Sequence, residues 1–160
     1  HLQELAQSDI QVIWQTGKNY IADCKAALAN NQLPIANSPI ICTDFISQMP
    51  LAYALADLVI SRAGASSISE LCLLGKPAIL VPSPNVAEDH QTHNAMALVR
   101  KDAAVLVKDK DAKEQMVATA LSLIADEQRL QLLRKNILTL ALPDSAIRIA
   151  QEVIKLAKKE

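Results

Sequence analysis

The sequence contains few aromatic residues and few glycines. Its 160 residues include one Trp, two Tyr, one Phe and three Gly, while 51% of them are hydrophobic. The core must therefore be built from Leu, Ile, Val and Ala. A chain of this length is typical of one domain, so we expect residues 1–160 to form a single domain with an aliphatic core.

Net charge and long hydrophobic runs are also lacking. The chain carries 16 basic and 17 acidic side chains, for a formal net charge of −1. Sequence-independent binding of nucleic acid requires a basic field, so we expect no nucleic-acid partner. No run reaches the roughly 18–20 apolar residues of a membrane span. The apolar segment Leu51–Ile60 is too short and contains Asp57, and no signal peptide is visible.

The three cysteines, Cys24, Cys42 and Cys72, show no CxxC spacing. An odd, scattered set is typical of reduced thiols in a cytosolic protein, and we expect each to be buried apolar filler. The first residues, HLQELAQSD, lack Met and have the pattern of a helix already under way. We therefore expect the chain to be a fragment of a longer protein.

Short apolar segments alternate with segments whose apolar residues recur every three or four positions, as in helices. The predicted strands are 10–17, 38–45, 57–61, 77–83 and 103–107. The predicted helices are 18–31, 49–57, 66–75, 88–101, 111–141 with a break near Ala125–Glu127, and 143–160. This alternation, with nearly all-apolar strands, predicts an α/β fold in which helices cover both faces of a parallel sheet. Ligands bind such sheets beyond the carboxyl ends of the strands.

The loop Ser61–Glu70 follows the third predicted strand and presents almost no side-chain bulk from Gly64 to Ser67. Free N–H groups at a helix start bind phosphate well when the backbone can be approached, and Arg62 could add charge. A second interpretation is a capping box, in which Ser67 and Glu70 satisfy the helix start themselves. Neither GxGxxG nor GxxxxGK[ST] is present.

The loop Pro82–Asn94 follows the fourth predicted strand and is crowded with polar groups. His90 and His93 share a helix face and could bind a metal with Glu88 or Asp89, although HxxH alone is a weak signal. A solvated helix start is a second interpretation. A third is recognition of a hydroxyl-rich ligand, because His, Gln and Asn both donate and accept hydrogen bonds.

Together the two loops suit a diphosphate and a sugar. A carboxylate one turn into the first helix, Glu70, could accept hydrogen bonds from ribose hydroxyls, as acidic residues do in dinucleotide sites. The combination predicts a nucleotide-sugar pocket.

Four separated segments closely resemble the C-terminal half of the MurG family, the UDP-N-acetylglucosamine–N-acetylmuramyl-(pentapeptide) pyrophosphoryl-undecaprenol N-acetylglucosamine transferases of bacteria. They are WQTGK (Trp14–Lys18), DFISQMPLAYALADLVISRAGASSISEL (Asp44–Leu71), GKPAILVPSP (Gly75–Pro84) and AEDHQTHNA (Ala87–Ala95). The likeness runs in order from about residue 10 to the final helix.

The resemblance implies the GT-B fold, with a cleft between two Rossmann-like halves. Residues 1–160 would be the C-terminal UDP-sugar-binding domain without its first strand, and 143–160 its terminal helix. The N-terminal domain would carry the lipid acceptor site, the membrane-facing patch and the catalytic base. The family implies a cytoplasmic protein, peripheral on the inner face of the bacterial cell membrane. No DxD-like motif lies in the two loops, so we expect the helix dipole to replace a metal and expect no cofactor.

The family's donor-site roles can be carried over residue by residue. The Ile46 backbone would pair with the uracil edge, and Phe45 and Met49 would wall the base. The backbone from Gly64 to Ser67 would cradle the diphosphate, and the Ser67 hydroxyl would add a bond. Glu70 would hold the ribose. The implied substrate-binding residues are Phe45, Ile46, Met49, Gly64, Ala65, Ser66, Ser67, Ile68, Ser69, Glu70, His90, Gln91 and Asn94.

In the sugar loop, Gln91 with His90 would contact the N-acetylglucosamine hydroxyls, and Asn94 would support the loop. Two positions depart from the family pattern. The family often has a Gln pair where this chain has His90 and Gln91, and Ser66 replaces a commonly apolar residue. The change at Ser66 matters little if its backbone does the binding.

The implied reaction moves N-acetylglucosamine from UDP to lipid I with inversion, giving lipid II for peptidoglycan, and hence serves the cell wall, cell shape and cell division. No catalytic residue is expected in this half, which alone would be inactive. Alternatives are a stand-alone donor-binding subunit of a split glycosyltransferase, a UDP-N-acetylglucosamine epimerase relative, and a flavodoxin-like signalling domain.

Overall fold

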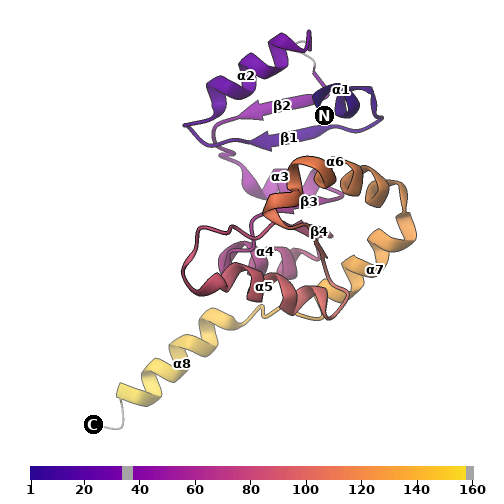
Figure 1. Ribbon diagram of the computed structural model, residues 1–160. Coiled ribbons are helices and arrows are strands. Elements are labelled where there is room, and N and C mark those ends of the chain that lie inside the picture. Colours follow the sequence, from indigo (N-terminus) through magenta and orange to yellow (C-terminus); the bar gives the residue numbers. More distant parts are fainter. Residues whose placement is uncertain (34–37, 158–160) are drawn as a thin grey trace. The chain divides into compact units, whose positions relative to one another are not determined.

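The computed structural model describes residues 1–33 and 38–157, with the backbone alone at Ala87. Strands and helices alternate along the chain (Figure 1), and all strand pairs in the described part are parallel. The predicted α/β class is confirmed, but the described strands form two parallel sheets where the sequence predicted one. The chain divides into two compact units, His1–Leu55 and Ala56–Glu160, and each is considered by itself.

The first unit contains a two-stranded parallel sheet with its helices. Its elements are α1 (Leu2–Gln7), β1 (Val12–Gln15), α2 (Ile21–Asn30), β2 (Ile40–Thr43) and α3 (Met49–Leu55). The strands pair in register from Val12↔Ile40 to Gln15↔Thr43. Helix α2 packs on this sheet through a small cluster in which Leu28 and Ile40 are almost fully buried.

A disulfide joins Cys24 of α2 to Cys42 of β2. The expectation of reduced thiols is therefore wrong for these two residues. Packing of α2 on β2 brings the two sulfurs together, and a separation of 18 residues in the sequence gives no sign of that contact. Cys72 is a free, buried thiol as expected, and burial raises its pKa.

The second unit is larger and is built around a three-stranded parallel sheet in the order β3-β4-β5. Its elements are β3 (Val59–Ser61), α4 (Ala65–Leu74), β4 (Ala78–Leu80), the 3₁₀ turn η1 (Ala87–Asp89), α5 (His90–Val99), β5 (Val105–Leu106), α6 (Asp109–Ala125), α7 (Glu127–Leu138) and α8 (Ser145–Ala157). Every residue of the central strand β4 is fully buried, as its unbroken apolar run predicts.

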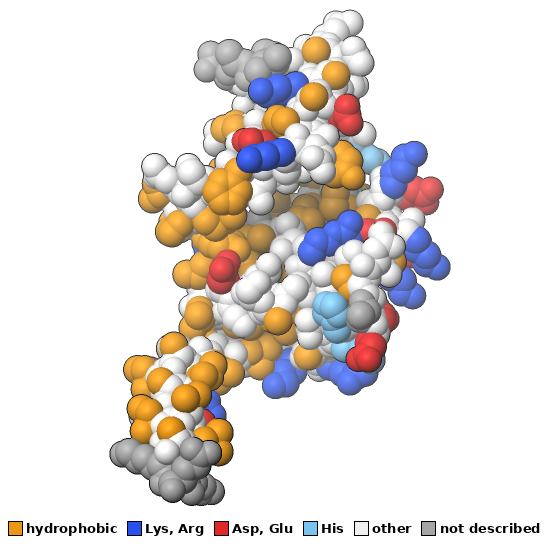
Figure 2. Space-filling view, turned by 90° about the vertical axis from the view of Figure 1, so that its left-hand side faces the viewer, with side chains coloured by type: hydrophobic (Ala, Val, Ile, Leu, Met, Phe, Trp, Pro, Cys, Tyr) orange, Lys and Arg blue, Asp and Glu red, His pale blue; other side chains and the backbone are white. Residues whose placement is uncertain are grey.

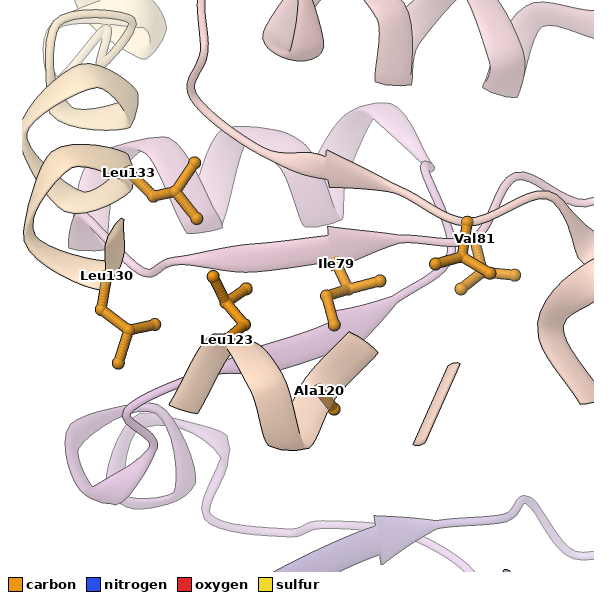
Figure 3. Packing of buried hydrophobic residues seen from close by; sticks show 7 residues of the cluster. Ile79, Val81, Ala120, Leu123, Leu130 and Leu133 are labelled. Carbon is orange, nitrogen blue, oxygen red and sulfur yellow. The ribbon is translucent and has the colours of Figure 1, made fainter. Parts of the chain in front are cut away.

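The core of the second unit is aliphatic. In Figure 3 the side chains of Ile79 from β4 and Leu123 from α6 approach each other, with Leu130 and Leu133 of α7 beside them. Helix α4 ends at Gly75, whose φ of +61° is in the left-handed region. A Cβ there would lie 2.7 Å from Leu138, so both the turn and the close approach of α7 favour glycine.

Each predicted strand and helix is present, with ends shifted by a few residues. The predicted break near Ala125–Glu127 falls at Asp126, whose side chain accepts a hydrogen bond from the Arg129 N–H and caps α7. Arg129 also binds Asp102 through both guanidinium nitrogens, at 2.8 and 2.5 Å, and these hydrogen bonds lower the pKa of Asp102. This pair attaches α7 to the turn that follows α5.

Helix α8 presents hydrophobic side chains to solvent along its length (Figure 2). Its exposed apolar residues are Ile147, Ile149, Val153, Ile154 and Leu156. The last three residues of the predicted helix 143–160 lie outside the described part of the chain. Within residues 1–33 and 38–157, no helix combines the length and the apolar content that crossing a bilayer demands.

Candidate functional site

The loop between β3 and α4 presents the start of a helix without a side-chain cap. Gly64 is the N-cap residue of α4, and its extended backbone leads into Ala65 as the first helical residue. The first hydrogen bond of the helix runs from the Ile68 N–H to the Gly64 carbonyl, at 3.0 Å. The N–H groups of Ala65, Ser66 and Ser67 precede that bond, so the helix itself gives them no acceptor. They form a cluster of donors with partial positive charge.

The capping-box interpretation is wrong for Ser67. It requires Ser67 at the N-cap position, but α4 begins at Ala65 and Ser67 lies inside its first turn. The Ser69 hydroxyl donates back to the Ala65 carbonyl at 2.9 Å, as serines inside helices often do. Glu70 follows in the next turn with an exposed side chain, on the helix whose first turn carries the uncapped donors.

Gly64 has a conformation that any residue could adopt, with φ −69° and ψ 146°. A Cβ built on Gly64 would meet only the Ser67 Oγ, at an ordinary 3.9 Å. Neither backbone strain nor packing therefore explains the glycine. The missing side chain leaves the backbone open beside the Ser67 hydroxyl in the first turn of α4, as expected where a ligand approaches the backbone closely.

Two amide side chains of α5 hold this loop in place. The Gln91 Oε1 accepts hydrogen bonds from the backbone N–H groups of Ala63, at 3.2 Å, and Ser83, at 2.9 Å. The Asn94 Nδ2 donates to the Ala63 carbonyl at 3.1 Å. Gln91 and Asn94 were expected at the sugar end of the pocket, and the structure brings them to the loop preceding α4. Ser83 was not singled out from the sequence.

Arg62 contacts the ends of neighbouring elements. Its Nη1 donates to the carbonyls of Val81, at 3.2 Å, and Pro82, at 3.4 Å, and pairs with the carboxylate of Asp109 at the start of α6. The side chain is about half exposed. Arg62 therefore connects the loop after β3 to the loop after β4. The sequence alone did not predict where its side chain would point.

The sugar-loop histidine, His90, opens α5 directly after two residues in the left-handed region. Glu88 has φ +55° and Asp89 has φ +49°, an uncommon conformation for residues with a side chain. The Thr92 hydroxyl donates to the Asp89 carboxylate at 2.6 Å. In residues 1–33 and 38–157, no group of three or more His, Cys, Asp or Glu is arranged to hold a metal ion.

In the first unit, the predicted nucleobase residues follow β2. Phe45 is 65% exposed, and Met49 opens α3. The Ile46 N–H, expected to face the uracil edge, donates to the Gln15 Oε1 at 2.8 Å. Sequence reasoning missed Gln15, although its place at the end of β1 beside β2 was a usable signal because Gln15 pairs with Thr43.

Comparison with known proteins gives a consistent family match. The model of a family described as the glycosyltransferase family 28 C-terminal domain matches residues 1–149. The chain is 57% identical over 159 residues to the UDP-N-acetylglucosamine–N-acetylmuramyl-(pentapeptide) pyrophosphoryl-undecaprenol N-acetylglucosamine transferase of Parabacteroides distasonis. It is 58% identical over 154 residues to the protein of the same name from Bacteroides thetaiotaomicron.

These alignments cover 99% and 96% of the chain, which spans only 42% and 40% of the length of the two relatives. Among solved structures, the crystal structure of Acinetobacter baumannii MurG matches with a TM-score of 0.78 at 28% identity. That match covers 99% of this chain and 44% of the solved one.

Proposed function

Because the chain belongs to the family of glycosyltransferase family 28 C-terminal domains, we propose that it binds UDP-N-acetylglucosamine as the donor half of an inverting glycosyltransferase. The two relatives described above are named as N-acetylglucosamine transferases. Their names favour a transferase over the epimerase and signalling-domain alternatives.

The observation that carries the proposal is the uncapped start of α4 behind Gly64. The N–H groups of Ala65, Ser66 and Ser67 suit a pyrophosphate because they donate hydrogen bonds and carry the positive end of the helix dipole. The Glu70 carboxylate would accept hydrogen bonds from the ribose hydroxyls. Gln91 would donate to the sugar hydroxyls through its amide nitrogen, because its oxygen is already engaged by backbone N–H groups.

In the proposed reaction, the C4 hydroxyl of the muramyl sugar attacks the anomeric carbon of N-acetylglucosamine. The new carbon–oxygen bond forms as the bond to the β-phosphate oxygen breaks, so the configuration inverts from α to β. UDP leaves with the electron pair, and the hydroxyl proton passes to a base outside this chain. Charge grows on the diphosphate, so the donors at α4 stabilise the transition state more than the bound substrate.

Binding of the acceptor and association with the membrane would require residues outside these 160. The acceptor would be lipid I and the product lipid II, so the enzyme would act in peptidoglycan synthesis and, through it, in cell shape and division. We propose that an acceptor domain, absent from these 160 residues, binds the lipid and associates peripherally with the inner face of the cell membrane.

Calorimetric titration of the protein expressed from its complete reading frame tests the proposal. We expect UDP-N-acetylglucosamine to bind in preference to UDP-N-acetylgalactosamine, and we expect binding to persist with a chelator because backbone donors hold the diphosphate. Equal affinity for the two sugars, no binding of either, or a strict requirement for magnesium would contradict the proposal.

A further inference from the structure

We propose that Gln91 and Asn94 are positioning residues for the diphosphate as well as neighbours of the sugar. This inference rests on the proposed function, because it assumes that the diphosphate binds at the start of α4. Three hydrogen bonds from these two side chains reach the backbone of the loops that follow β3 and β4.

Two successive peptide groups around Ala63 are fixed by these contacts. Gln91 accepts from the Ala63 N–H, which belongs to the peptide group before Ala63. Asn94 donates to the Ala63 carbonyl, which belongs to the peptide group after it. Ala63 is fully buried and both amide side chains are partly buried, so water competes weakly for these bonds.

The Asn94 contact sets the direction of a donor in the candidate site. In a trans peptide the carbonyl and the following N–H point in opposite directions. Because Asn94 holds the Ala63 carbonyl toward α5, the N–H of Gly64 points away from α5. Gly64 is the N-cap of α4, so this N–H stands next to the donors of Ala65–Ser67. Asn94 therefore orients the first donor of the proposed phosphate cradle.

The contacts of Gln91 show which atom of its side-chain amide remains available to bind a ligand. Backbone N–H groups can only donate, so the atom that meets Ala63 and Ser83 must be the side-chain oxygen. The amide nitrogen then lies on the other side of the group, where a hydroxyl oxygen of the sugar could accept from it. One side chain thus links the sugar end of the pocket to the loop that precedes the phosphate donors.

The test uses ligands of increasing length, namely uridine, UDP and UDP-N-acetylglucosamine, in the protein expressed from its complete reading frame. Two variants, Asn94→Ala and Gln91→Met, remove the contacts to Ala63. The control is His93→Ala, because His93 is exposed on the same helix and makes none of these contacts. Affinities are measured by calorimetry or by competition, and each variant's melting temperature is recorded.

We expect Asn94→Ala and Gln91→Met to weaken UDP about tenfold, the effect of losing hydrogen bonds that orient a donor. Uridine affinity and the His93→Ala control should be unchanged. UDP-N-acetylglucosamine should weaken at least as much as UDP, and more in Gln91→Met.

Unchanged UDP affinity in both variants, with weaker binding of the sugar nucleotide alone, would overturn the inference and leave these residues as sugar contacts. An equal loss for all three ligands together with a lower melting temperature would also overturn it, since that is a general structural effect. If the unsubstituted protein failed to bind UDP, the proposed function itself would fall.

Discussion

In each unit, a glutamine side chain accepts a hydrogen bond from the backbone of a loop that follows a strand, but the two hydrogen bonds should affect ligand binding in opposite ways. In the first unit, the Gln15 Oε1 accepts from the Ile46 N–H, the group expected to pair with uracil. In the second unit, the Gln91 Oε1 accepts from the N–H groups of Ala63, which directly precedes the N-cap of α4, and of Ser83 in the loop after β4. The first glutamine occupies a predicted ligand contact, and the second supports one.

The two predicted ligand contacts, each considered within its own unit, therefore differ in how far they are prepared for a ligand. A diphosphate would meet donors whose directions are already set, and such preorganisation lowers the cost of binding. A uracil base that uses the Ile46 N–H would first have to displace Gln15. The diphosphate end should therefore contribute most of the affinity, and the base end should be improved by removing the competitor.

The two units also differ in how they are stabilised. The first has a small buried cluster and a disulfide from Cys24 to Cys42. The second has a larger aliphatic core in which α6 and α7 pack against β4, and no disulfide is found among its described residues. Small units bury little apolar surface and are only marginally stable, so the disulfide should supply a large part of the stability of the first unit.

The largest expected effect concerns that disulfide. Closing a loop of this length stabilises a fold by roughly 3 kcal/mol, so reduction should destabilise the first unit by about that amount. Thermal unfolding with and without a reductant measures it. The control is a double variant, Cys24→Ser with Cys42→Ser. Its melting temperature should be the same with and without the reductant. Equal melting of the unsubstituted protein in both conditions would show that the disulfide does not stabilise this unit.

Gly64→Val should have the next largest effect, on UDP binding. The substitution fits the backbone but adds bulk beside the Ser67 hydroxyl, where we propose that the diphosphate approaches the start of α4. Losing charge-assisted hydrogen bonds of about 1.5–3 kcal/mol each should weaken UDP by roughly 100-fold or more. Gly64→Ala is the graded control and should lose less. If Gly64→Val kept both its melting temperature and its affinity for UDP, the start of α4 would not be part of the UDP site.

Glu70→Ala should weaken UDP by about 1–3 kcal/mol, because the ribose hydroxyls would lose their charged acceptor. Titration with UDP and with its 2′-deoxy analogue measures this. The deoxy analogue should lose less affinity in the variant than UDP does. If Glu70→Ala lost the same affinity for both nucleotides, Glu70 would not bind the 2′-hydroxyl.

The smallest expected effect is a gain. Gln15→Met keeps the side-chain volume but removes the acceptor that holds the Ile46 N–H. Uridine should bind a few-fold more tightly, since one competing hydrogen bond contributes about 1 kcal/mol. Competition against labelled UDP can resolve such a change. A clear loss of uridine affinity would show instead that Gln15 holds the loop in its binding conformation.

The sequence was sufficient to predict the strands and the helices, within a few residues at their ends. Periodicity located each strand and helix, and Gly75 and the break at Asp126 marked real helix ends. The start of α4 was predicted to within one residue, but its N-cap is Gly64 and not Ser67, the residue that the capping-box spacing favoured. Local spacing cannot reveal which of several possible caps the fold uses.

The contacts that distinguish the two loops could not be predicted from sequence. Gln15 and Ile46 are 31 residues apart, and Gln91 and Ala63 are 28 apart. Their hydrogen bonds depend on strand pairing and helix packing, which set side chains beside distant backbone groups. The same holds for the disulfide, because only the packing of α2 on β2 brings its two sulfurs together.

The central claim is that the diphosphate of a uridine donor binds the backbone N–H groups from Gly64 to Ser67. A crystal structure of the protein with bound UDP tests it most directly. The account predicts β-phosphate oxygens within about 2.7–3.2 Å of those nitrogen atoms. Well-ordered phosphates bound at another place, with these N–H groups facing only water or a protein side chain, would contradict it.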